Sequence, residues 1–369
     1  MIALLCMLAL GAIAPREGRF SWLRGARELH RELESTGAAG YYEGLLNAGI
    51  ARSPGREVEP PRPARPEGWV AFVDSGIIAF EPGYRRWRMK AGVDTFWNGN
   101  PFRTNRLGFR SPEISIEKPP GTYRVVVLGS SNTMGHGVDD DSVYVRLLER
   151  WLNEEVGPEG PRVEVVNLAS SGESPSQRLS RLKEDVERLD PDWILCDASV
   201  IDVSLEELHL DQMIRTRVEI PLPYVRRAIA KARVSSDDTS PVIQSRLRTV
   251  AEDLLRGAYE GWGEESRRLG TPVAVILLPR ADQKARNPTL RRLMLDLSER
   301  NGLRIYDLLD AFETLTPEEF RVAPWDNHPS VLGHRVIFEA LRAAILRDGG
   351  CPGLRFSTRR LSIEKNAST

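Results

Sequence analysis

The sequence predicts an α/β fold, a three-layer α/β/α sandwich around a mostly parallel five-stranded sheet. From Tyr123 onward, short apolar segments rich in β-branched residues alternate with longer amphipathic segments. Such alternation is typical of a parallel sheet whose helical connections cover both faces. In addition, serines and glycines follow the first apolar segment, at the carboxyl end of a strand, where open α/β sheets bind ligands.

Five short segments have the composition of buried strands. They are residues 123–128, 163–167, 193–196, 273–278 and 304–306. Apolar runs of this length, without regular alternation of polar residues, indicate strands that are covered on both faces.

Helical patterns separate these strands. They cover residues 142–155, 176–189, 246–269, 287–300 and 331–347. In the first of them, Val145, Leu148 and Leu152 share one face, as in an amphipathic helix. Residues 203–244 interrupt the alternation, and we interpret them as an insertion beside the site, with a lid as its candidate role.

The chain divides into four parts by composition. Residues 1–14 are a signal-like or anchor segment, and 15–104 form a helical and irregular region with a proline-rich linker. Residues 105–347 form the main domain and 348–369 a C-terminal tail. The aromatic residues before position 105 indicate a core more than a sugar-binding platform.

Residues 2–14 form an apolar run of 13 residues. A spanning helix needs about 20 residues, so the run fits the apolar part of a signal peptide better. No basic residue precedes it, which leaves an uncleaved anchor or a start further upstream as alternatives, beside a buried N-terminal helix. We expect export to the periplasm or the extracellular space, or membrane tethering, with a cytoplasmic location as the alternative.

Composition excludes several classes of function. A net charge of -1 gives no overall field that favours nucleic acid, and three cysteines form no disulfide framework. We expect these thiols to be buried or unpaired. The phosphate-binding loop of nucleoside triphosphatases, the zinc motifs and the Gly-x-Ser-x-Gly elbow do not occur. The sequence therefore predicts neither a cofactor nor a metal.

Two distant segments carry the residues of a nucleophilic site. Ser131 follows the first predicted strand, and Asp326 stands two residues before His328 near the C-terminal helix. A serine hydroxyl needs a base to remove its proton, and histidine suits this task near neutral pH. A carboxylate fixes the ring tautomer and stabilises the imidazolium. We therefore predict Ser131 as nucleophile, His328 as base and Asp326 as the orienting acid.

These segments resemble the blocks of the SGNH/GDSL hydrolases. Gly129-Ser130-Ser131-Asn132-Thr133-Met134-Gly135 is similar to the nucleophile block, and His328-Pro329-Ser330-Val331-Leu332-Gly333-His334 to the terminal block. Residues 167–174 resemble the second block and 199–202 the third. The run at 105–113 is similar to the segment that precedes the nucleophile block in many bacterial members. The resemblance covers residues 105–347 and implies a flavodoxin-like fold.

The resemblance also implies roles for residues in this chain. The backbone N–H groups of Ser131 and Gly172 would donate to the oxyanion. This sequence departs from the family pattern at four positions, which are Ser130 for aspartate, Ser199 for glycine, Ile201 for asparagine and Trp325 for aspartate. An isoleucine side chain donates no hydrogen bond, so Ser199 is the candidate substitute donor. His136 and Asn132 are candidate substrate contacts.

Each role has a structural alternative. Ser131 would instead cap the next helix, His328 would be a loop histidine, and Asp326 would cap the helix that follows it. Gly172 would be an ordinary turn glycine, and Asp202 a local cap or hydrogen-bond acceptor. We expect His334 to be structural, because it lies inside the last helix.

The resemblance implies a serine esterase that acts on small acyl esters, such as acetyl groups on a glycan or a small molecule. One alternative is an O-acyltransferase, in which a sugar hydroxyl replaces water. The other is a non-catalytic binding or accessory protein, which Ser130 and Ile201 motivate. The oligomeric state is left open.

Overall fold

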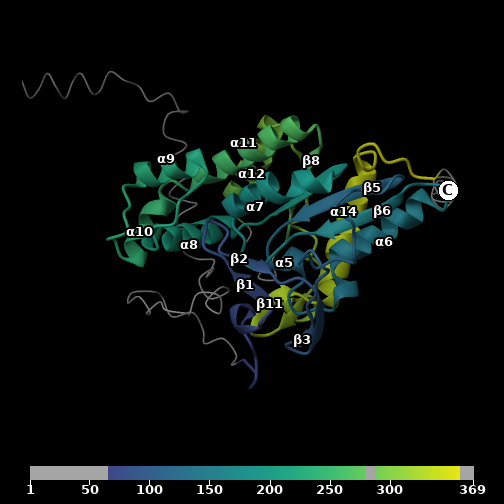
Figure 1. The fold of residues 1–369 in the computed structure, drawn as a ribbon, viewed down its shortest axis with the longest axis horizontal. Helices are drawn as coiled ribbons and strands as arrows, with labels where there is room; N and C mark the ends of the chain where they lie inside the picture. The colour runs from purple at the N-terminus through teal and green to yellow at the C-terminus, as the bar shows by residue number, and fades with distance from the viewer. Residues whose placement is uncertain (1–64, 280–286, 358–369) are drawn as a thin grey trace, which may run out of the picture.

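The computed structural model describes residues 65–279 and 287–357 (Figure 1). At its centre is a five-stranded, all-parallel sheet with the order β6-β5-β7-β8-β9. Its strands are β5 (Thr122–Leu128), β6 (Arg162–Asn167), β7 (Trp193–Ala198), β8 (Val273–Leu277) and β9 (Arg304–Asp307). The predicted fold class is confirmed, and each predicted strand is present.

Side chains that alternate along β5 build two separate cores. Val125 and Val127 face one layer, which holds α6 (Tyr144–Val156) and α14 (Val331–Arg347). Val126 and Leu128 face the opposite layer. That layer holds α7 (Pro175–Arg181), α11 (Ala251–Leu269) and α12 (Pro288–Arg300). The sheet is therefore covered on both faces, as its uninterrupted apolar strands predict.

The predicted helix over 246–269 is wrong as a single element. α10 (Ser240–Arg248) ends before Thr249, and α11 begins at Ala251. The Thr249 hydroxyl donates to the Arg246 carbonyl at 2.7 Å, and this local bond competes with helix continuation.

Two other predicted helices have irregular ends. The segment predicted at 142–155 begins as a helix only at Tyr144, because Asp139 caps the short 3₁₀ turn η2 (Asp140–Ser142) before it. After α7, the segment predicted at 176–189 continues as a π turn, η3 (Leu182–Val186), and a 3₁₀ turn, η4 (Glu187–Leu189).

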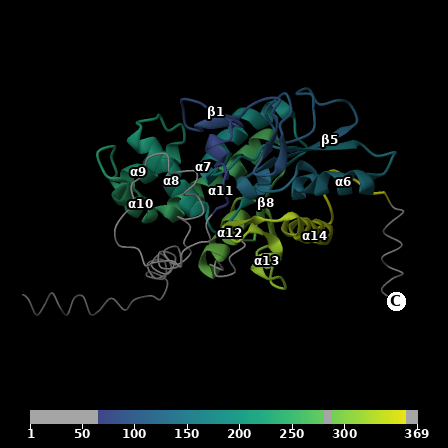
Figure 2. The same ribbon diagram turned by 90° about the horizontal axis from the view of Figure 1, so that it is seen from below.

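The interruption at 203–244 is helical. It contains α8 (Asp202–Arg215), α9 (Pro223–Ala232) and the first part of α10. α8 packs against α7 and α10, and α9 packs against α11. Both views show α9 and α10 at one end of the molecule and α6 toward the other (Figures 1 and 2). A lid role stays a prediction.

Two antiparallel hairpins precede the sheet. They are formed by β1 (Ile78–Phe80) with β2 (Trp87–Met89), and by β3 (Asp94–Trp97) with β4 (Asn100–Arg103). Their aromatic core packs against Met134 and Ala169, which follow β5 and β6. The hairpins therefore lie at the carboxyl edge of the sheet, beside the predicted site.

The aromatic residues of this region divide into two groups. Phe72, Trp87 and Trp97 are buried, as predicted, whereas the prediction of a core role is wrong for Phe80 and Phe96, which are exposed. Phe96 precedes the buried Trp97 on β3, so alternation points its side chain to the outer face, whereas Phe80 is the last residue of β1.

Several predictions from the sequence concern other segments. The apolar run at 2–14 and the part of the predicted helical and irregular region before residue 65, with most of its proline-rich linker, lie outside the described residues. Within the described ranges, no helix has both the length and the apolar character to cross a membrane. Cys196 and Cys351 are buried free thiols, as expected.

Candidate active site

The turn after β5 places Ser131 at the carboxyl edge of the sheet. Gly129 and Ser130 lead into α5 (Ser131–Met134), and Ser131 is 1% exposed. A Cβ at Gly129 would lie 2.3 Å from Oδ2 of Asp197, so only glycine fits here. The Ser131 hydroxyl has no hydrogen-bond partner among the residues that the structure describes. Ser130 occupies the N-cap position, so the alternative that Ser131 caps this helix is wrong.

A buried ion network, formed by Arg178, Asp197 and Asp202, supports this turn. Oδ2 of Asp197 accepts from the Ser130 N–H at 2.8 Å and from the Thr133 hydroxyl at 2.6 Å. Arg178 lies 3.2 Å from Asp197 and 2.9 Å from Asp202. Asp202 also accepts from the Ser199 N–H at 3.2 Å, which confirms its predicted role as an acceptor. Burial raises the pKa of Asp202, although Arg178 opposes the shift.

The predicted base lies on a separate hairpin, formed by β10 (Arg321–Ala323) and β11 (Asp326–Pro329). Asp326 and His328 are alternate residues of β11, a spacing that puts both side chains on one face. Oδ1 of Asp326 accepts from the His328 N–H at 3.0 Å and lies 2.5 Å from Nδ1 of the same residue. Ser330 caps α14 by accepting from the Gly333 N–H, so the alternative role of Asp326 as this cap is wrong.

The contact with Asp326 defines the tautomer of His328. A carboxylate oxygen only accepts, so in the neutral ring Nδ1 carries the hydrogen and Nε2 is the basic atom. Burial would raise the pKa of Asp326, but the imidazoles of His328 and His136 hold it well below its usual range. Asp326 is therefore a carboxylate at neutral pH, ready to stabilise an imidazolium.

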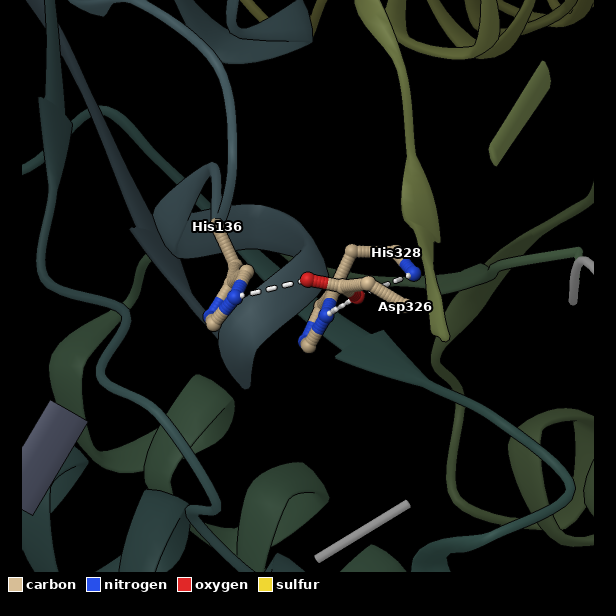
Figure 3. Close-up of side chains that lie close together, drawn as sticks. All are labelled: His136, Asp326 and His328. Carbon is tan, nitrogen blue, oxygen red and sulfur yellow. Dashed lines mark hydrogen bonds and ion pairs between the residues drawn. The ribbon is translucent and has the colours of Figure 1, made fainter. Parts of the chain in front are cut away.

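A second histidine completes this cluster (Figure 3). We expected His136 to contact substrate, and the structure places its Nε2 3.0 Å from Oδ2 of Asp326. Its ring is stacked on that of His328, with centroids 3.8 Å apart and planes inclined by 8°. The sequence did not predict this contact, because 190 residues separate His136 from Asp326 and no motif joins them.

The nucleophile turn and the base hairpin meet, because α5 packs against β11. This contact brings the segments of Ser131 and His328 to the same edge of the sheet, as their predicted roles require. Asn132, the other candidate substrate contact, is buried in α5.

The other predicted oxyanion residues follow β6 and β7. Gly172 has a left-handed backbone, with φ +72°. The Ser199 N–H is bonded to Asp202, which leaves only the side chain of Ser199 for donation to substrate. Ile201 is buried in the apolar core and precedes α8. His334 is also buried, and its Nδ1 accepts from the Tyr144 N–H at 3.4 Å, consistent with a structural role.

Arg110 is a site residue that the sequence did not reveal. It is 3% exposed and lies 2.8 Å from Asp140. Its guanidinium donates to the carbonyls of Met134, Gly135 and Val138, and so holds the segment that carries His136. The only signal is its place in the run at 105–113, since composition does not distinguish a buried arginine from a surface one.

The cluster of His136, Asp326 and His328 has side chains of the types that bind metals. Their ligand atoms lie within 4.8 Å of one another. Zinc ligands lie about 2.0–2.2 Å from the ion, so two of them in tetrahedral geometry are separated by more than about 3 Å. The 2.5 Å between Nδ1 of His328 and Oδ1 of Asp326 is a direct hydrogen bond instead. Asp326 is therefore in contact with both imidazoles through hydrogen-bond distances rather than through an ion.

Comparison with solved structures finds partial similarity. An acetylxylan esterase from Geobacillus stearothermophilus is 19% identical, with a TM-score of 0.40, over 60% of this chain and 93% of that chain. An alpha/beta hydrolase enzyme, LAE5, from the metagenome of Lake Arreo, Spain, is 20% identical, with a TM-score of 0.40, over 60% of this chain and 94% of that chain. No curated protein matches.

The match to a protein family is more extensive. The model of the GDSL-like lipase/acylhydrolase family matches residues 127–336, from the end of β5 into α14. This range includes both the nucleophile turn and the base hairpin, and it spans more than half of the 369 residues. The predicted resemblance is thus confirmed, and the chain belongs to the GDSL-like lipase/acylhydrolase family of ester-hydrolysing enzymes.

Proposed function

We propose that this enzyme is a serine esterase for small acyl esters, with Ser131 as nucleophile, His328 as base and Asp326 as the acid that orients the base. The observation that carries the proposal is the hydrogen bond between Asp326 and His328 on β11, which packs against α5. A carboxylate that accepts a hydrogen bond from Nδ1 fixes the tautomer of the ring and leaves Nε2 as the basic atom, as in other hydrolases with a serine nucleophile.

In the first step, Oγ of Ser131 forms a bond to the ester carbonyl carbon while Nε2 of His328 takes the hydroxyl proton. The tetrahedral intermediate then breaks its bond to the alcohol oxygen, which receives that proton from His328. Water then attacks the acyl-serine while His328 takes its proton. The bond to Oγ of Ser131 breaks, Oγ receives that proton from His328, and the carboxylic acid is released. The Ser131 and Gly172 N–H groups are the proposed oxyanion donors, and the Ser199 hydroxyl replaces the side-chain donor that Ile201 lacks.

We further propose that a glycan provides the alcohol side of the ester. A pocket of about 440 Å³ borders His136 and Asp326. Its walls include the half-buried indoles of Trp69 and Trp325, with the amide of Asn100 in the same lining. Indole faces pack against the apolar faces of sugar rings, and amides bond to hydroxyl groups, so this lining suits a carbohydrate better than a lipid chain.

The direct test is turnover of p-nitrophenyl acetate and of an acetylated oligosaccharide by purified protein. We expect release of acetate from both, and loss of turnover in Ser131→Ala and His328→Ala. If these variants and the wild type share one background rate while all are folded, the proposed site is wrong. A sugar acceptor added to the same assay separates the alternatives, because an acyltransferase would form a new ester in place of acetate.

We also propose that the enzyme works outside the cytoplasm, exported or tethered through residues 1–14. The apolar run in that segment is the observation behind this proposal. Fractionation of cells that express the full chain tests it, and recovery of the protein in the cytoplasmic fraction alone would contradict it.

A further inference from the structure

The carboxylate of Asp326 contacts two imidazoles, and the proposed reaction uses only one of them. Oδ1 lies 2.5 Å from Nδ1 of His328, and Oδ2 lies 3.0 Å from Nε2 of His136 (Figure 3). The side chains of His136 and Asp326 are 9% and 10% exposed, so little water competes for these contacts. Because a carboxylate oxygen only accepts, Nε2 of His136 carries a hydrogen.

His136 is held in place on several sides. One face of its ring is stacked on His328, and the Trp97 indole meets it edge to face at 4.4 Å. Its backbone N–H donates to the Ser131 carbonyl at 3.0 Å. Arg110 binds the carbonyls on both sides of it. The side chain is therefore a fixed link between the nucleophile turn and Asp326.

The second ring nitrogen of His136 supports the same role. Its Nδ1 is buried and has no hydrogen-bond partner among the described residues. An extra proton on Nδ1 would thus be an unsatisfied buried donor. Hydrogen on Nε2, which donates to Asp326, is therefore the arrangement that the surroundings fit.

The spacing of the acid and the base explains why a second donor is needed. Asp326 stands two residues before His328, one fewer than in the usual family pattern. On β11, Oδ1 of Asp326 serves both the backbone N–H and the ring of His328. Oδ2 is then turned away from the base, and a buried carboxylate oxygen without a donor is costly. His136 supplies that donor.

We infer that His136 is a positioning residue, which fixes Asp326 through its Nε2–H and fixes the plane of the His328 ring by stacking. This inference rests on the proposed function of Ser131, His328 and Asp326. No bond of His136 changes during the reaction, because it acts on the base only through contacts with Asp326 and His328.

The role has an electrostatic consequence. A hydrogen bond to Oδ2 draws negative charge away from the oxygen that faces His328. Without this hydrogen bond, Asp326 stabilises protonated His328 more strongly. The pH below which kcat falls, because His328 is protonated, then moves to a higher value. Among the described residues, the nearby charged or titratable groups include His334 from α14, Arg110, Asp139 and Asp140 from the segments around α5, and Glu67 in the lining of the same pocket. A substitution of His136 leaves all of them unchanged.

Two variants separate the donor from the ring. His136→Phe keeps an aromatic face against His328 but cannot donate, whereas His136→Gln can donate to Oδ2 but cannot stack. For His136→Phe we expect kcat to fall roughly 10-fold to 100-fold, since misplacement of about 1 Å has an effect of this size. We also expect an unchanged KM and an acid limb at higher pH. His136→Gln should recover most of kcat and the original limb. A wild-type kcat and pH profile in His136→Phe would overturn the inference.

Two controls keep the outcome clear. If Ser131→Ala and His328→Ala retain activity, the proposed function fails; if they are inactive while His136→Phe equals the wild type, only this inference fails. NMR of the wild-type protein with ¹⁵N-labelled histidine tests the inference even if His136→Phe does not fold. We expect hydrogen on Nε2 of His136, assigned by loss of the signal in His136→Gln. Hydrogen on Nδ1 alone would overturn the inference.

Discussion

Ser131 lies on a turn that the central sheet supports, whereas His328 lies on a two-stranded hairpin outside that sheet. The turn follows β5, which has neighbours on both sides, and Asp197 of β7 binds its first residues. The hairpin of β10 and β11 contacts α13 (Pro317–Phe320), α14 and α5. The nucleophile is thus placed by the core of the fold, and the base by local contacts.

The two regions also balance charge differently. In the buried ion network, the guanidinium of Arg178 lies between two carboxylates. At the base, one carboxylate lies between two imidazoles. The first arrangement holds its carboxylates with a fixed cation, while the second can accept a proton during the reaction. We expect substitutions in the first region to affect mainly stability and those in the second mainly turnover.

The largest expected effect is on turnover. Asp326→Asn keeps the size of the side chain but favours the wrong tautomer of His328, so kcat should fall by about 10⁴-fold. Steady-state kinetics with p-nitrophenyl acetate measures the effect, with Asp296→Asn on the outer face of α12 as control. A fall of less than about 10-fold would show that Asp326 does not orient the base.

Arg178→Met should have the largest effect on stability. It leaves Asp197 and Asp202 buried without their cation, and loss of one partner from a buried pair costs about 3–5 kcal/mol. Urea unfolding measures the change, and Arg300→Met, at an exposed pair with Asp296, should cost less than about 1 kcal/mol. Equal losses in both variants would show that the buried ion network contributes no more to stability than a surface ion pair.

The stability of the protein should fall in mild acid. Burial lowers the pKa of both His209 and His334 to about 3 in the folded protein. Their unfolded pKa is about 6.5, so the stability contributed by each is full above that pH. It is lost as the pH falls from about 6.5 toward 3, at about 1.4 kcal/mol per unit for each group.

His209→Phe tests this pH dependence away from the proposed site. It should remove the contribution of one histidine to the pH dependence of the unfolding free energy, because phenylalanine does not titrate. Phenylalanine also retains a ring to meet Tyr84 edge to face, as His209 does at 4.7 Å. Urea unfolding at pH 7, 6 and 5 measures the slope. The same slope in both proteins would contradict the assignment of His209 as a buried neutral group.

Gly129→Ala should have a smaller effect on stability than Arg178→Met. Its methyl group would meet Thr133 at 2.6 Å as well as Asp197, and overpacking of this kind costs about 1–3 kcal/mol. Turnover should also fall, because the displaced turn carries Ser131. Gly302→Ala, at a turn with φ +67° and open space around it, should lower the unfolding temperature without loss of turnover. Full activity in Gly129→Ala would refute the fixed turn.

Much of the sheet region was predictable from the sequence. Val125–Leu128 and Val273–Leu277 are apolar runs too short for helices, and such runs predict buried strands. The break at Thr249 was not predictable, because the apolar period continues across it while a single hydroxyl bond ends the helix. Local hydrogen bonds of this kind leave no periodic signal.

The candidate site was predictable only in part. Asp326 and His328 are two residues apart, so their alternation on a strand makes their contact a local property of the sequence. His136 and Arg110 belong to the site through tertiary contacts with distant segments. One sequence shows such residues but not their partners.

The central claim is that Ser131 is a nucleophile activated by His328. Labelling with a fluorophosphonate, followed by peptide mass spectrometry, tests it most directly. We predict one adduct on Ser131 of the wild type, none in Ser131→Ala, and slow labelling in His328→Ala. Folded wild-type protein that takes no label, or that takes it on another serine, would contradict the claim.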